Sequence, residues 1–258
     1  MELSWYHYLI AMLGSTLAGS INTLAGNGST ITLTILTELL GLPGNMANGT
    51  NRIGALTQSM AGVYAFHRNG KLNLQRSRTI ILLNVLGALA GVGVAVSISN
   101  EAFMGVFRFL MLFMLVVIMV KPSRWLRATD TSRQTSPWVT VPLYLALGFY
   151  SGFIQMGMGI FFLAVAVLYA HYNIIEANAI KLVVVGLNTI LAIAVFQYQG
   201  LIDWKIGALM AIGQTVGGYF TAHYASRYPQ GSLWAHRLLV AVVVLALVKM
   251  FNLHQIFW

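Results

Sequence analysis

The sequence contains no cysteine, and only 8% of its 258 residues carry an acidic or basic side chain. Without cysteine the chain can form neither disulfide bonds, nor thiolate metal sites, nor a cysteine nucleophile. No glycine-rich phosphate-binding motif is present, which excludes ATP hydrolysis by this chain. No histidine has a suitably spaced partner for a metal site. The sequence therefore predicts no cofactor, no metal and no redox chemistry.

Apolar residues, by contrast, make up 58% of the chain. This share indicates an integral membrane protein rather than a water-soluble domain. Helices are expected, because open strands leave backbone groups unpaired in lipid and the segments lack the alternation of a barrel. The predicted fold class is an all-α polytopic membrane protein with roughly 8–10 membrane segments. Its ten apolar stretches are Trp5 to Ala25, Ser29 to Leu42, Met46 to Phe66, Thr79 to Ile98, Phe103 to Val120, Trp138 to Gly159, Ile160 to His171, Asn178 to Tyr198, Trp204 to Ala225 and Leu233 to Met250.

The charges are unbalanced, with fifteen lysines and arginines against six acidic residues and a formal net charge of +9. The basic residues lie mostly between apolar stretches, so membrane topology explains them better than a nucleic-acid partner does. Basic loops are typically cytoplasmic, which places the loops 67–78 and 121–137 in the cytoplasm. Glu2 is the only charge before the first stretch, so we expect no cleaved signal peptide and an N-terminus that faces outward.

An internal repeat relates the two halves of the chain. "MANGTNR" at 46–52 corresponds to "EANAIKL" at 176–182, and Gly87 corresponds to Gly217 at the same offset along the chain. Further upstream, "SINTLAG" at 20–26 is paired with "FIQMGMG" at 153–159, at an offset that is larger by three positions. The predicted organisation is a first transmembrane repeat at 1–120, a basic cytoplasmic linker at 121–137 and a second transmembrane repeat at 138–258.

The charges of two equivalent loops predict how the repeats are oriented. The loop 67–78 is strongly basic, whereas its counterpart at 198–205 balances Asp203 against Lys205. Equivalent loops on opposite sides of the membrane imply inverted repeats of about five apolar segments each. The first two segments of each half are expected to be short or re-entrant. Such repeats are typical of secondary transporters whose site lies at the repeat interface.

Polar residues interrupt the apolar sequence at two neighbouring places in the first half. Gly26, Asn27 and Gly28 end one apolar stretch, and the free backbone N–H groups at the start of the next would favour an anion. Arg52 lies within the following stretch, where an arginine at a helix centre costs about 2.5–3.5 kcal/mol on insertion scales. Lys181 occupies nearly the same place in the second half. We expect these two cations to converge on one negatively charged ligand.

Each of these features has an alternative interpretation. Arg52 could extend to the membrane interface or pair with Glu38, and Lys181 could pair with Glu176. The same two glutamates are the acidic residues that could carry protons for coupling. Glycines such as Gly87 are expected to serve helix packing rather than binding.

Two runs of the sequence resemble the signatures of the sulfite exporter TauE/SafE family of membrane permeases. They are "AGSINTLAGNGSTITLTILTELLGLPGNMANGTNR" in the first half and "GFYSGFIQMGMGIFFLAVAVLYAHYNIIEANAIK" in the second. Family members commonly have an unbroken glycine run where Asn27 stands here, so the substrate preference could differ from that of a sulfite exporter. The substrate-binding residues that the resemblance implies are Asn22, Thr23, Gly26, Asn27, Gly28, Ser29, Asn48, Thr50, Asn51, Arg52, Gln155, Gly157, Gly159, Asn178 and Lys181.

The resemblance implies a secondary transporter that exports a small sulfur-containing anion, such as sulfite or an organosulfonate, across a bacterial inner membrane. Alternating access between inverted repeats is the expected mechanism. An anion channel or a noncatalytic membrane partner subunit is the alternative. An enzyme is not expected, because no pattern pairs a nucleophile with a base. The expected partners are the anion and the lipid bilayer, and a homo-oligomer is left open.

Overall fold

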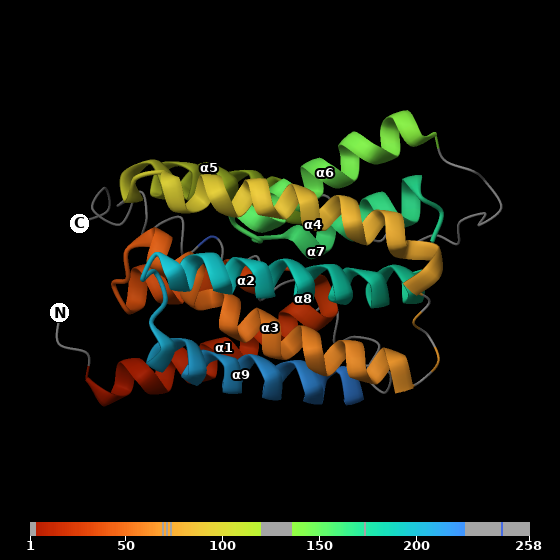
Figure 1. Cartoon of the computed structure of the whole chain (residues 1–258). Helices are drawn as coiled ribbons and strands as arrows, with labels where there is room; N and C mark the ends of the chain where they lie inside the picture. The colour runs from red at the N-terminus through yellow and green to blue at the C-terminus, as the bar shows by residue number, and fades with distance from the viewer. Residues whose placement is uncertain are drawn as a thin grey trace.

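The computed structural model describes residues 4–68, 70, 72, 74–119, 136–172, 174–224 and 244. All regular structure in these residues is helical, and Figure 1 shows the long helices lying alongside one another in a bundle. The first half contains α1 (Trp5–Ala25), α2 (Gly28–Thr34), the π-helical turn η1 (Ile35–Leu39), α3 (Gly44–Arg68), α4 (Leu74–Ser97) and α5 (Asn100–Met119). The second half contains α6 (Pro137–Phe153), α7 (Met158–Ala164), the π-helical turn η3 (Val165–Tyr169), α8 (Ile174–Tyr198) and α9 (Trp204–Tyr224).

The order of elements is repeated along the chain. In each half a long helix breaks, a short helix runs on into a π-helical turn, and two long helices follow. Helix α3 begins at Gly44 and α8 at Ile174, which are equivalent at the offset of the "MANGTNR" motif, and both helices contain 25 residues. The π-helical turns are followed by the left-handed residues Gly41 and His171, which are equivalent at the same offset. The spacing predicted from "MANGTNR" onward is therefore present in the helices themselves.

Glycines bring the first helix of each half against the fourth helix of the other half, α1 against α9 and α6 against α4. A Cβ atom at Gly217 would overlap the carbonyl oxygen of Thr16, and one at Gly87 would overlap that of Leu145. Backbones this close leave no room for a side chain. Both glycines therefore serve helix packing, as expected.

These paired contacts correct the alignment of the first helices. Because Gly87 and Gly217 are equivalent, their partners Thr16 and Leu145 are equivalent too, at an offset one position smaller than that of the two glycines. The larger offset expected for "SINTLAG" and "FIQMGMG" is therefore wrong for α1 and α6. Matching glycines by sequence placed the motifs out of register, because four residues separate the first helix from the short helix in the second half, whereas two separate them in the first half.

The distribution of polarity is that of a protein in lipid. Large apolar side chains lie on the outside, whereas amides, hydroxyls and two cations lie buried between the helices. Among the described residues, three helical segments are long and apolar enough to cross a membrane: Ser77–Ser97, Asn100–Val117 and Glu176–Tyr198. The total of roughly 8–10 membrane segments stays a prediction.

Some expected boundaries differ from those observed. The stretch expected from Trp138 to Gly159 is not continuous, because α6 ends at Phe153 and α7 takes up Met158 and Gly159. Of the first two segments expected to be short in each half, only the second is, since α2 and α7 have 7 residues each, whereas α1 has 21 and α6 has 17. The linker 121–137 and the last stretch, Leu233 to Met250, lie almost wholly outside the described residues.

Candidate functional site

The breaks in the two halves lie against each other in the interior. Gly26 ends α1 in the left-handed conformation, with φ +72°, and its N–H donates to the carbonyl of Asn22 at 2.9 Å. A Cβ atom at Gly26 would lie 3.3 Å from the backbone of Gly159 in α7, and one at Gly159 would lie 2.6 Å from the carbonyl oxygen of Gly26. The glycine motifs of the two repeats are thus brought into backbone contact, which only glycines permit at this distance.

The first break is stabilised by its own polar side chains. Asn22 Oδ1 accepts a hydrogen bond from the Gly28 N–H at 3.2 Å, so one N–H at the start of α2 already has a partner. The Thr30 hydroxyl donates to Asn27 Oδ1 at 2.5 Å. Asn27 is fully buried, and its Nδ2 has no acceptor among the described residues. Ser29 contributes its carbonyl, which accepts from Thr32 at 3.2 Å.

Arg52 binds the end of α6. Its Nη1 donates to the carbonyl of Ser151 at 2.7 Å and to Gln155 Oε1 at 2.9 Å. Its Nη2 donates to the carbonyl of Gly152 at 2.8 Å and to Asn48 Oδ1 at 3.2 Å. Asn48 Nδ2 adds a hydrogen bond to the carbonyl of Phe153 at 2.6 Å. We call this network the Arg52 clasp.

The Arg52 clasp has a clear electrostatic basis. The last carbonyls of a helix have no partner within the helix and carry partial negative charge, so a cation there is stabilising. The Arg52 guanidinium is fully buried and also lies over the Phe196 ring, at 6.0 Å from its centroid. Its four acceptors are neutral oxygens, and Glu38 is not among them. The pairing of Arg52 with Glu38 considered above is therefore absent.

Two other predicted residues of α3 also hold the structure together. The Thr50 hydroxyl accepts a hydrogen bond from the N–H of Asp203 at 3.0 Å, which ties the residue just before α9 to α3. Asn51 Oδ1 accepts from the hydroxyl of Thr32 at 2.5 Å, and Asn51 Nδ2 has no acceptor among the described residues.

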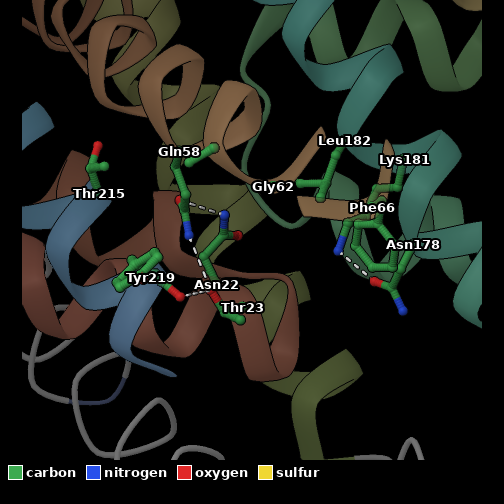
Figure 2. Close-up of a pocket in the computed structure, with 12 residues that line it drawn as sticks. Asn22, Thr23, Gln58, Gly62, Phe66, Asn178, Lys181, Leu182, Thr215 and Tyr219 are labelled. Atoms are coloured by element: carbon green, nitrogen blue, oxygen red, sulfur yellow. Dashed lines mark hydrogen bonds between the residues drawn. The ribbon is translucent and has the colours of Figure 1, made fainter. Parts of the chain in front are cut away.

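A cavity of about 320 Å³ lies between α1, α3, α8 and α9, so both halves contribute to it. We call it the Lys181 cavity, because Lys181 carries the only charge among its described lining residues. Figure 2 shows Asn22, Thr23 and Gln58 together at one side of the view and Lys181 with Asn178 at the other. The described lining comprises Asn22, Thr23, Gln58, Ala61, Gly62, Phe66, Asn178, Lys181, Leu182, Thr215, Gly218 and Tyr219.

Lys181 is held by its own helix. Its Nζ donates to Asn178 Oδ1 at 2.9 Å, and 7% of the residue is exposed. An ammonium group has three protons to donate. The other two have no acceptor among the described residues, so the group can still bind a ligand.

The opposite side of the Lys181 cavity is an amide network. Asn22 Nδ2 donates to Gln58 Oε1 at 2.9 Å. Gln58 Nε2 in turn donates to the carbonyl of Gly19 at 2.9 Å and to the Thr23 hydroxyl at 3.3 Å. These bonds fix both amides while leaving one Asn22 proton and one Gln58 lone pair for a ligand.

Comparison with known proteins identifies the family. The sequence matches the family described as "Sulfite exporter TauE/SafE" over residues 11–250. The chain belongs to the TauE/SafE family. It is therefore a membrane transporter rather than an enzyme, in agreement with the expectation from its motifs.

Curated proteins similar to this TauE/SafE protein are named as probable membrane transporters. It is 27% identical to "Probable membrane transporter protein ORF9" of Sinorhizobium sp, over 96% of this chain and 94% of the relative. It is 28% identical to a "Probable membrane transporter protein" of Haemophilus influenzae, over 78% of each chain. It is 24% identical to "Probable membrane transporter protein YfcA" of Escherichia coli strain K12, over 81% of this chain and 76% of that one. No solved structure matches the chain.

The predicted site residues fall into two groups in this TauE/SafE structure. Asn22, Thr23, Asn178 and Lys181 line the Lys181 cavity. The others lie at the breaks, in the clasp or beside them: Gly26, Asn27, Gly28, Ser29, Asn48, Thr50, Asn51, Arg52, Gln155, Gly157 and Gly159. Arg52 does not line the cavity, so the expected convergence of Arg52 and Lys181 on one ligand is not observed.

Sequence reasoning missed eight of the described residues that line the Lys181 cavity. They are Gln58, Ala61, Gly62, Phe66, Leu182, Thr215, Gly218 and Tyr219. Gln58 carried a usable signal, because it is a polar residue inside an otherwise apolar stretch. Glu38 in η1 and Glu176 in the first turn of α8 are not among the described lining residues. Their role in proton coupling stays a prediction.

Proposed function

We propose that this protein exports a small sulfur-containing anion, such as sulfite or an organosulfonate, across the bacterial inner membrane by alternating access. The observation that carries the proposal is the Lys181 ammonium, which lines a cavity built by both halves and lacks an acidic counter-charge among the described lining residues. A buried cation with free protons gains most from a ligand that brings negative charge and several oxygen acceptors. A sulfite or sulfonate group supplies both.

Alternating access draws support from the relation between the two halves. In Figure 1 the equivalent helices α3 and α8 run in opposite directions, which is the arrangement that inverted repeats produce. Such a pair has two arrangements of similar energy, related by exchanging the roles of the halves. The open Lys181 cavity and the closed Arg52 clasp fit one of these two arrangements.

Export draws support from the position of the cavity. Its lining extends along α3 to Phe66, two residues before α3 ends at the exposed Arg68. The connection that follows, between α3 and α4, belongs to the basic segment 67–78, which we assign to the cytoplasm. An anion would enter from that side, drawn by the positive charge of the loop.

Transport by purified protein in liposomes tests the proposal. Efflux of sulfite and of alkanesulfonates should saturate with concentration, and Lys181→Ala should reduce the rate at least about tenfold, because the ligand loses a charge-assisted hydrogen bond. Lys205→Ala is the matched control, since Lys205 is exposed and lies over the Tyr8 ring, 5.4 Å from its centroid. Unsaturable flux with single-channel currents would assign the protein to the channels instead, and unchanged efflux in Lys181→Ala would remove Lys181 from the site.

A further inference from the structure

We propose that the ligand of the Lys181 cavity is an elongated organic monoanion, in which a short carbon skeleton joins the acid group to an uncharged hydrogen-bonding group. This inference rests on the proposed function and narrows its substrate class. It predicts preference for such an anion over inorganic sulfite and over a zwitterion.

The length of the cavity is the first argument. Gln58, Gly62 and Phe66 all line it and lie four residues apart along α3. Since an α-helix rises about 1.5 Å per residue, the lining extends roughly 12 Å from Gln58 to Phe66. Sulfite, a sulfur atom with three oxygens, can occupy only one part of such a cavity.

The volume leads to the same conclusion. The cavity measures about 320 Å³. On this measure a cavity needs only about 10–15 Å³ to hold one water molecule, so the space is large enough for many groups of that size. Sulfite has four non-hydrogen atoms and would leave more than half of the cavity to water.

The two sides of the cavity offer different chemistry. Lys181 lies beside Asn178 at one side, where an acid group can accept its free protons. Asn22 and Gln58 lie at the other side and together offer one proton and one lone pair. That combination suits a hydroxyl or an amide. It suits an ammonium group poorly, because no acidic residue is among the described lining residues.

The wall between these two sides is apolar. Leu182 and Gly62 lie along it, and Figure 2 shows Gly62 between the amide network and Lys181. A Cβ atom at Gly62 would lie 2.5 Å from Leu182 Cδ1, so a methyl group there would push the leucine side chain aside. Gly62 therefore gives the Leu182 side chain the room that it occupies, and displacing this side chain would alter the apolar wall that a carbon skeleton would contact.

Three alkanesulfonates that differ by one group, together with sulfite, test the inference on the unmodified protein. Calorimetric titration would compare sulfite, propane-1-sulfonate, 3-hydroxypropane-1-sulfonate and 3-aminopropane-1-sulfonate. We expect the hydroxysulfonate to bind tightest, about tenfold tighter than propane-1-sulfonate, because one further hydrogen bond is formed. Sulfite and the aminosulfonate should bind more weakly than propane-1-sulfonate. If sulfite binds as tightly as the hydroxysulfonate, the inference fails while the proposed function stands.

Two variants locate the effect in the cavity. Gly62→Ala should weaken the hydroxysulfonate at least about tenfold and leave sulfite within about twofold, since only the longer ligand contacts the apolar wall. Gly93→Ala is its matched control, because a Cβ atom at Gly93 in α4 meets nothing within 4 Å. Equal weakening of both ligands by Gly62→Ala would overturn the inference. Binding of no probe, with Lys181→Ala indistinguishable from the unmodified protein, would instead overturn the proposed function.

Discussion

The region around Arg52 and the Lys181 cavity are equivalent in the two halves, but a side chain fills the first whereas the second is open. Leu182 of the Lys181 cavity is the repeat equivalent of Arg52, and Phe66 is the repeat equivalent of Phe196, which packs against the Arg52 guanidinium. In one region the arginine fills the interior and binds the end of α6. In the other a leucine leaves a cavity. The same framework thus accommodates either a structural side chain or a ligand.

When the two halves are aligned, the two buried cations lie one sequence position apart. Lys181 is equivalent to Asn51, the neighbour of Arg52, and so leaves its helix at a different angle. Lys181 has a single hydrogen-bond partner among the described residues, whereas Arg52 has four. Four acceptors hold the Arg52 side chain in the fold, although its Nε has no partner among the described residues, whereas Lys181 with its single acceptor remains available to bind. This difference leads to four predictions.

The largest effect is expected from Leu182→Arg, which places an arginine where the first half has one. The new side chain should fill the Lys181 cavity and abolish anion binding in a calorimetric titration, while the melting temperature stays close to that of the original protein. Leu182→Met preserves volume and polarity and serves as the control. Anion binding that persists in Leu182→Arg would mean that the two regions are not interchangeable.

Arg52→Met should lower the stability of the protein more than any single substitution in the cavity lining. The carbonyls of Ser151 and Gly152 would lose their donors in a buried setting, at a cost of at least about 3 kcal/mol for the pair. Thermal unfolding in detergent measures the loss, with Arg68→Met at the exposed end of α3 as control. An unchanged melting temperature together with lost anion binding would return Arg52 to the ligand site.

Gly87→Ala and Gly217→Ala should destabilise the protein by similar amounts, about 1–3 kcal/mol each, because both insert a methyl group against a neighbouring backbone carbonyl. Unfolding by heat would compare them with Gly93→Ala. Clearly unequal losses would show that the packing of α1 with α9 is not energetically equivalent to that of α6 with α4.

Among these four predictions, Asn178→Ala should cause the smallest change, a modest loss of anion affinity. Lys181 loses the acceptor that orients its ammonium group, so anion affinity should fall by about three- to tenfold, the worth of one ordinary hydrogen bond. The folded protein should persist, as judged by its melting temperature. A tighter complex in this variant would indicate that Asn178 competes with the ligand for Lys181.

Much of the fold follows from the sequence. The apolar run from Trp5 to Ala25 is α1 in full, and the spacing of "MANGTNR" and "EANAIKL" matches the offset between α3 and α8. Such features are local, because apolar runs and glycine positions determine where helices begin, end and approach one another. The misplaced register of α1 and α6 arose where glycines are too numerous for one pairing to be preferred.

The candidate site was less predictable. Lys181 and Asn22, which were predicted because polar groups within apolar stretches are costly unless they have a role, both line the cavity, and their part in binding stays a prediction. The separation of Arg52 from Lys181 could not be foreseen, since it depends on the carbonyls at the end of α6, which the sequence does not mark. Gln58 joined the site only through its contact with Asn22, a residue of another helix.

The touching backbones of Gly26 and Gly159 have a mechanical consequence. Neither residue carries a side chain, so no side-chain packing between these two residues opposes a movement of one half against the other. For the alternating access proposed above, a methyl group on either glycine would obstruct the movement at this contact.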